Sequence, residues 1–189
     1  DANGKLAPVF IAVANIEAND GGAAIAAGNA RVLSARLSDA KFFWDGDVAK
    51  VREHGLEAFT PKLADIVFHE KLGTVADKVE RVAALARHLA DFIPGCNADL
   101  AEQAARLCKA DLTTGTVGEF PEVQGLAGGY LAHAAGLPAA VADAIRDHYM
   151  PVGGATPVPV DIVSIVVALA DRLDSLTGCF AVGLAPTGA

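Results

Sequence analysis

Four ionisable side chains interrupt stretches of sequence that are otherwise apolar: Lys78, Asp111, His148 and Asp171. The spacing of the apolar residues predicts that Asp111, His148 and Asp171 face inward on three helices, with Lys78 at the edge of the apolar stripe of a fourth. A charged group in such a place needs a partner or water, because burying it alone is costly. Carboxylates and an imidazole that meet in an interior can hold a catalytic metal ion, so metal-assisted hydrolysis is one interpretation of this set.

Lys78 favours a different interpretation. A catalytic metal needs roughly four ligands, and an ammonium group would compete with the metal for the same carboxylates. We therefore expect Lys78 to neutralise Asp111 or Asp171 in a structural ion pair, and we predict no catalytic residue and no metal site in this chain. The other histidines show no ligand spacing and are expected to be surface or structural residues: His54, His69, His88 and His133.

The four helices can be located from their end signals and their apolar periodicity. Thr74, with Asp77 three residues later, predicts the capped start of the first helix. The others are predicted at residues 100–112, from Pro138 onward, and from 160 to about 176. Each carries one of the four ionisable side chains.

The N-terminal part reads differently. Residues 8–16 are apolar and β-branched and predict one strand, and the alanine-rich text of residues 23–50 predicts a connector helix. A further helix is predicted at residues 61–73. Because a single strand has no partner in the helical remainder, we expect the rest of its sheet to lie upstream, in a longer protein. The predicted fold is mainly α, with residues 1–50 as the end of an upstream α+β domain and residues 51–189 as a helical domain.

Composition restricts the function. The 189 residues carry a net charge of −8, so the chain lacks the broad cationic field typical of nucleic-acid binding, and any RNA contact must be local. Two small groups of basic residues are candidates: Arg31 with Arg36 and Lys41, or Lys78 with Arg81 and Arg87. The cysteines are odd in number and widely spaced, which predicts reduced thiols. Ser164 and Asp171 interrupt the longest apolar run too soon for a membrane span.

Several short segments resemble the HD superfamily of metal-dependent phosphohydrolases, in which a His, a His-Asp doublet and a late Asp hold the metal. DKVERVAALA has Lys78 at the position of the first His, and KADL has Ala110 in place of the second His but keeps Asp111. AIRDHYMP keeps His148, and VALADRLD keeps Asp171. The resemblance implies an HD-like orthogonal helical domain with a degenerate pocket. A divergent HD phosphohydrolase acting on a nucleotide or phosphate ester is the alternative function.

A second resemblance covers nearly the whole chain. GKLAPVFIAVANIE, GNARVLSARLSDAKFFWDGD, VFHEKLGT, VGEFPEVQG and ALADRLDSLTGCFAVGLAPTG follow one another in this order. Together they resemble the β subunit of the bacterial glycyl-tRNA synthetase. That family implies an α₂β₂ enzyme that joins glycine to its tRNA using ATP, with the adenylation site in the α subunit and tRNA recognition largely in β.

The second resemblance also implies partners and a location for this chain. We expect it to be inactive alone and to bind no cofactor, since the full enzyme uses ATP at the α subunit. Its expected partners are the α subunit, the remainder of the β subunit and glycine tRNA, in the cytoplasm and without a membrane. The residues expected to touch tRNA are Lys78, Arg81 and Arg87. Whether the HD-like region holds the tRNA or packs against neighbouring subunit domains is left open by the sequence.

Overall fold

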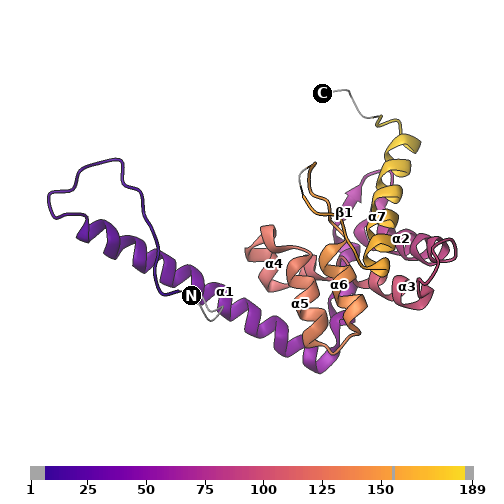
Figure 1. The fold of residues 1–189 in the computed structure, drawn as a ribbon, viewed down its shortest axis with the longest axis horizontal. Helices are drawn as coiled ribbons and strands as arrows, with labels where there is room; N and C mark the ends of the chain where they lie inside the picture. The colour runs from indigo at the N-terminus through magenta and orange to yellow at the C-terminus, as the bar shows by residue number, and fades with distance from the viewer. Residues whose placement is uncertain (1–6, 155, 186–189) are drawn as a thin grey trace. The chain divides into compact units, whose positions relative to one another are not determined.

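A computed structural model describes residues 7–154 and 156–185 of the chain (Figure 1). Two compact units are present, Asp1–Phe42 and Phe43–Ala189. Helix α1 (Ala23–His54) runs through the boundary between them. The elements after α1 are η1 (Leu56–Asp65), β1 (Val67–His69), β2 (Gly73–Thr74), α2 (Val75–Ala90), α3 (Ala98–Leu107), η2 (Ala110–Thr113), α4 (Gly115–Glu119), η3 (Pro121–Val123), α5 (Leu126–Ala134), α6 (Ala139–Asp147) and α7 (Ile162–Ala181). The prediction of a mainly helical chain is confirmed.

The strand predicted at residues 8–16 is not found in the structure. This segment has no regular secondary structure, and its side chains are exposed. Apolar, β-branched composition favours a strand only where the backbone pairs with a neighbour. Within the described residues, the strands that pair are β1 and β2, and neither reaches this segment. The composition was therefore not sufficient to predict a strand.

The last turns of α1 belong with the second unit. Val51 is buried in the main core of that unit, and Trp44 and Val48 pack against the same core. The carboxylate of Asp47 accepts hydrogen bonds from the backbone N–H groups of Gly115 and Thr116, which begin α4. Residues 43–50, which the sequence assigned to the upstream segment, thus help to build the second unit.

The prediction of a helix at residues 61–73 is wrong. Pro61 lies inside the 3₁₀ helix η1, and the chain then forms the small antiparallel sheet in which Val67 of β1 lies opposite Thr74 of β2. Valine and phenylalanine at the start of β1 favour extended backbone. Gly73 has a φ of +86°, a conformation that glycine adopts without steric cost, so it ends a turn rather than a helix.

Helix α2 begins as predicted. The Thr74 hydroxyl accepts a hydrogen bond from the Asp77 N–H at 3.2 Å, and the Asp77 carboxylate accepts one from the Thr74 N–H at 2.7 Å. This capping box satisfies N–H groups that the first turn would otherwise leave unpaired. The helix then buries Val79 and Val82 on one face.

The core of the second unit lies among α2, α3, α6 and α7: α2 and α6 each pack on α3 and α7, α3 packs on α7, and α5 packs on α6 (Figure 1). Most of its buried side chains are alanine and valine, so the helices approach closely. α3 ends at Leu107, earlier than predicted, and the chain turns through η2. Among the described residues no helix combines the length and the apolar character that a bilayer span requires.

Candidate functional site

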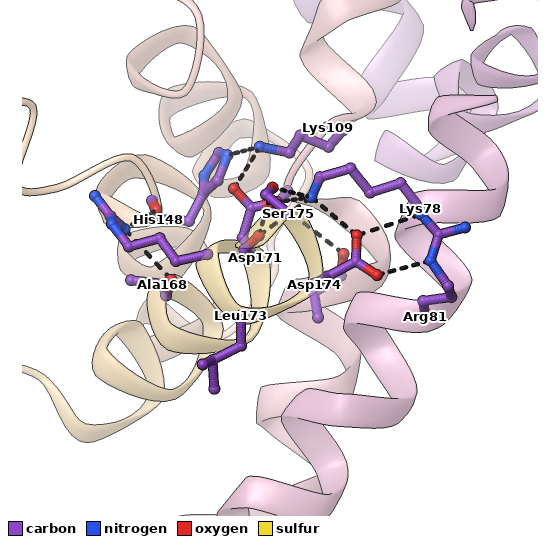
Figure 2. Close-up of polar contacts among 12 residues, drawn as sticks. Lys78, Arg81, Lys109, His148, Ala168, Asp171, Leu173, Asp174 and Ser175 are labelled. Carbon is purple, nitrogen blue, oxygen red and sulfur yellow. Dashed lines mark hydrogen bonds and ion pairs between the residues drawn. The ribbon is translucent and has the colours of Figure 1, made fainter. Parts of the chain in front are cut away.

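Lys78 lies on α2 with its ammonium group in the interior (Figure 2). Its Nζ donates to the Ser175 hydroxyl at 2.7 Å, to Asp174 Oδ2 at 3.1 Å and to the backbone carbonyl of Asp171 at 3.1 Å. The Asp171 carboxylate pairs with the same ammonium, with Oδ1 at 3.1 Å from Nζ. The predicted ion pair between Lys78 and Asp171 is therefore present.

A second buried lysine completes the arrangement. Lys109 follows the end of α3 and is 5% exposed, and its Nζ donates to Asp171 Oδ2 at 3.1 Å. The same ammonium lies 2.9 Å from His148 Nε2 and 3.9 Å from the centre of the Tyr149 ring. We call Lys78, Lys109, His148, Asp171 and Asp174 the ionic network. Within the ionic network, the positive charges of two ammonium groups are balanced by the negative charges of two carboxylates.

The contacts of His148 define its protonation state. Nδ1 lies 2.7 Å from the backbone carbonyl of Ile145, which can only accept, so Nδ1 carries the proton. Nε2 then accepts from the Lys109 ammonium. Burial, together with the charge of Lys109, lowers the pKa of His148 to about 3. The imidazole is neutral at physiological pH and acts as a hydrogen-bond acceptor.

The carboxylate of Asp171 remains charged inside the protein. Burial by itself would raise the pKa of Asp171, but the charges of Lys109 and Lys78 outweigh it and hold the pKa below the ordinary value. Asp174 also accepts from Arg81, from Nε to Oδ1 at 2.7 Å and from Nη2 to Oδ2 at 3.3 Å. The network thus extends from the core to a partly exposed arginine.

Asp111 has a separate role. Its Oδ2 accepts hydrogen bonds from the backbone N–H groups of Gly125, at 2.5 Å, and Gly128, at 3.2 Å, at the start of α5. Burial raises the pKa of Asp111, although these two amides act in the opposite direction. Ala110 lies beside it in the apolar core. The structure therefore brings Lys78, His148 and Asp171 together, while Asp111 serves as an N-terminal cap for a neighbouring helix.

The ionic network does not fit a metal ion. Each carboxylate oxygen of Asp171 faces an ammonium group at 3.1 Å, and the free nitrogen of His148 already accepts from Lys109. The groups that would bind a cation are thus already bound to cations, and a metal would have to displace both lysines from a buried position. In the described part of the chain no group of three or more His, Cys, Asp or Glu side chains is arranged to hold a metal.

Comparison with known proteins defines the family. The sequence profile described as "Glycyl-tRNA synthetase beta subunit" matches residues 1–189. The chain belongs to this family. Curated glycine–tRNA ligase beta subunits from Rhodospirillum centenum and Phenylobacterium zucineum are each 57% identical to it, over 98% and 99% of the chain. One from a Ruegeria species is 54% identical over 95% of the chain. The chain spans only 26% to 28% of the length of these relatives.

The residues expected to touch tRNA differ in accessibility. The ammonium of Lys78 is enclosed by the ionic network, which argues against a contact with RNA. Arg81 and Arg87 are partly exposed, and both already have acidic partners. Arg87 donates to Asp99 at 2.8 Å and to Glu102 at 2.7 Å. A role for these two arginines in binding RNA stays a prediction.

Three residues of the site were missed from the sequence: Lys109, Asp174 and Ser175. Asp174 and Ser175 follow Asp171 by three and four residues, and helical spacing of this kind places all three side chains on adjoining parts of one helix face. That signal could have identified them. Lys109 follows Ala105 by four residues and lies at the edge of the apolar stripe of the helix predicted at residues 100–112, where a lysine is more often a solvent-exposed flanking residue.

Proposed function

We propose that this chain is a helical scaffold within the β subunit of a glycine–tRNA ligase, where it contributes to tRNA recognition and subunit architecture in the ATP-dependent charging of tRNA with glycine. The match of the family profile to residues 1–189 supports the identity of the enzyme. One observation supports a scaffold rather than a catalytic role: both carboxylate oxygens of Asp171 are paired with lysines, Oδ1 with Lys78 and Oδ2 with Lys109. On this proposal the chain is inactive alone.

The alternative, a divergent HD phosphohydrolase, requires an open metal site. The order of the residues along the chain supports an HD-like ancestry: Lys78 on α2, Ala110 and Asp111 in η2, His148 after α6 and Asp171 on α7. Two of the expected imidazoles are replaced by Lys78 and Ala110, and the remaining free nitrogen of His148, Nε2, accepts a hydrogen bond from Lys109. We therefore propose a degenerate HD-like domain in which an ion-pair network has replaced the metal.

The cofactor, partners and location follow from the proposed enzyme. We infer that this chain binds no cofactor and that ATP is used at the α subunit. The proposed partners are the α subunit, the remainder of the β subunit and glycine tRNA. A translation enzyme of this kind would act in the cytoplasm, without a membrane partner.

The proposed tRNA contacts are Arg81 and Arg87, which are both exposed on α2. The guanidinium groups of both arginines are paired with carboxylates. An RNA phosphate that binds either arginine would take the place of these carboxylates. Binding through these residues should depend on salt, because each phosphate contact releases condensed counterions. The acidic neighbours Asp99 and Glu102 reduce the local positive potential, so we expect a contact that contributes to binding without dominating it.

The test uses the full-length β subunit with its α subunit and labelled glycine tRNA at low and moderate salt. Arg81→Ala and Arg87→Ala should each weaken binding and reduce the magnitude of the salt slope by about one. Arg146→Ala is the matched control, since Arg146 is similarly exposed and paired with carboxylates, but on α6. If Arg81→Ala and Arg87→Ala bind tRNA as tightly as the unmodified protein and the Arg146→Ala control, the two arginines do not contact RNA.

A second measurement addresses the phosphohydrolase. Metal content and phosphatase activity are determined with Mn²⁺, Mg²⁺ and Zn²⁺ on nucleotide and phosphate-ester substrates. We expect neither a bound transition metal nor turnover. A stoichiometric metal with turnover that is lost in an Asp171→Asn variant would overturn the scaffold proposal.

A further inference from the structure

Helix α7 has an apolar face on each side. Val163, Val166 and Val167 are buried in the core. On the outer side, four large apolar residues follow one another at steps of four, three and four residues, and each exposes between 37% and 53% of its surface: Leu169, Leu173, Leu176 and Phe180. We call these four residues the outer stripe. Leu173 extends from α7 away from the ionic network (Figure 2).

The spacing of the outer stripe is that of a helix that packs on another helix. Steps of four, three and four residues place apolar side chains at the a and d positions of a heptad, where they pack into the spaces of a facing helix. Exposed apolar residues on soluble proteins are more often scattered singly. Exposed apolar residues that recur at this heptad spacing therefore indicate a surface on which a second helix packs.

The surface is hollowed and extends beyond the end of the helix. A largely apolar groove of about 560 Å³ runs beside the outer stripe, and Leu184 and Cys179 contribute to its lining. Leu184 is held there by the helix end: its N–H donates to the carbonyl of Cys179 at 2.8 Å, and Gly183, with a φ of +81°, donates to Phe180 at 3.1 Å. This pair of bonds is a Schellman motif, which places an apolar residue against the last turn of a helix.

The area of this surface restricts what can cover it. The outer stripe and Leu184 are five residues, each between 37% and 53% exposed, whereas a stable interface between separate proteins involves about 20 to 30 residues on each side. A patch of this size is too small for a stable dimer through α7 alone. It is sufficient for a segment of the same polypeptide, because a tether supplies a high effective concentration.

We propose that the outer stripe of α7 is the docking surface for an amphipathic helix supplied by a segment of the same polypeptide, outside residues 1–189. The lengths of the relatives support this occupant, since the chain matches them over nearly all its residues yet spans 26% to 28% of them. The docking helix carries apolar residues at heptad spacing and polar residues on its other face. The inference rests on family membership and is independent of the proposed tRNA role.

The half-buried thiol of Cys179 lies in the groove and reports whether the groove is covered. The experiment uses the full-length β subunit, purified without the α subunit and treated with N-ethylmaleimide. Peptide mass spectrometry then measures the labelling rate of Cys179. We expect slow labelling, and we expect the double variant Leu173→Gln/Leu176→Gln to raise the rate at least about tenfold because it weakens docking of the helix.

The chain offers matched controls for this measurement. Thr177→Gln/Ala181→Gln introduces the same polar side chains at exposed positions of α7 that lie off the outer stripe, and it should leave the rate unchanged. Cys108 is fully buried and burial raises its pKa to about 12, so it stays unlabelled as long as the core is folded. Labelling of Cys179 without labelling of Cys108 therefore separates loss of docking from unfolding.

Three outcomes would overturn the proposal. Labelling of Cys179 in the unmodified β subunit at the rate of a denatured control would show that the groove is open. Slow labelling that requires added α subunit would assign the surface to another chain. Slow labelling that requires a high concentration of the β subunit would assign it to a second copy.

Discussion

The structure makes a quantitative prediction for Lys109. Substitution by methionine, which has a similar length and no charge, removes the donor to both Asp171 Oδ2 and His148 Nε2. Asp171 keeps Lys78 as its partner, so the carboxylate is not left entirely uncompensated. We therefore expect Lys109→Met to lower the free energy of unfolding by about 3 kcal/mol, the low end of the range for breaking a buried ion pair.

Asp171→Asn should cost more than Lys109→Met. It leaves two buried ammonium groups facing a neutral amide, and Asp174 then supplies the remaining carboxylate of the ionic network. We expect a loss of about 4 kcal/mol. The double variant removes an ammonium together with the carboxylate that it pairs with, so its loss should be smaller than the sum of the two single losses by about 1 to 3 kcal/mol.

Urea unfolding followed by tryptophan fluorescence can measure these changes. Trp44 is the single tryptophan of the chain, packs against the core and has its ring centre 6.4 Å from that of Tyr130. The pair Arg87→Met and Asp99→Asn is the control, and because both groups are exposed it should change stability little. Strictly additive losses at Lys109 and Asp171, or a Lys109→Met variant as stable as the parent, would refute the assignment of Lys109 to the ionic network.

Two further predictions concern the helices around the site. Buried His148 has a pKa of about 3, while an unfolded imidazole titrates near 6.5, so the unfolded state binds more protons between these values. The free energy of unfolding should therefore fall as the pH drops from 6.5 to 5, by at most about 1.4 kcal/mol per pH unit from this group, and urea titrations of His148→Gln should show a shallower slope. Gly128→Ala should lower the free energy of unfolding by about 1 to 3 kcal/mol in the same assay, since the added carbon would lie 2.9 Å from Ile145 and 3.0 Å from the Asp111 carboxylate. Gly118→Ala, which meets no atom within 4 Å, should not be destabilising, and equal stability of the two alanine variants would contradict the packing argument.

Local signals in the sequence were sufficient for several elements. The capping box of Thr74 and Asp77 acts within one turn, and the structure shows it as predicted. The inward position of Asp171 followed from an apolar run that continues on both sides of it, and its pairing with Lys78 followed from the cost of burying a lone charge. In these cases the determining interactions lie within a few residues or follow from charge balance alone.

The errors arose where distant contacts decide the local structure. The hairpin of β1 and β2 begins six residues after Pro61, which by itself resembles a helix start. Lys109 is brought into the core by the end of α3 at Leu107 and the tighter turn of η2, and neither has a clear marker in the sequence. Asp111 was expected as a possible partner of Lys78, but its carboxylate accepts from the backbone N–H groups of Gly125 and Gly128 at the start of α5. The path of the loop that leads to α5 could not be predicted from the sequence.

The two lysines on Asp171 have a consequence for how this domain can change over generations. Replacing Lys109 alone removes a donor from both Asp171 and His148, and replacing Asp171 alone leaves Lys109 without its carboxylate partner. Single substitutions that would open this site to a metal ion are therefore expected to pass through less stable proteins. The stability of the ionic network therefore opposes any conversion of this site into a metal centre.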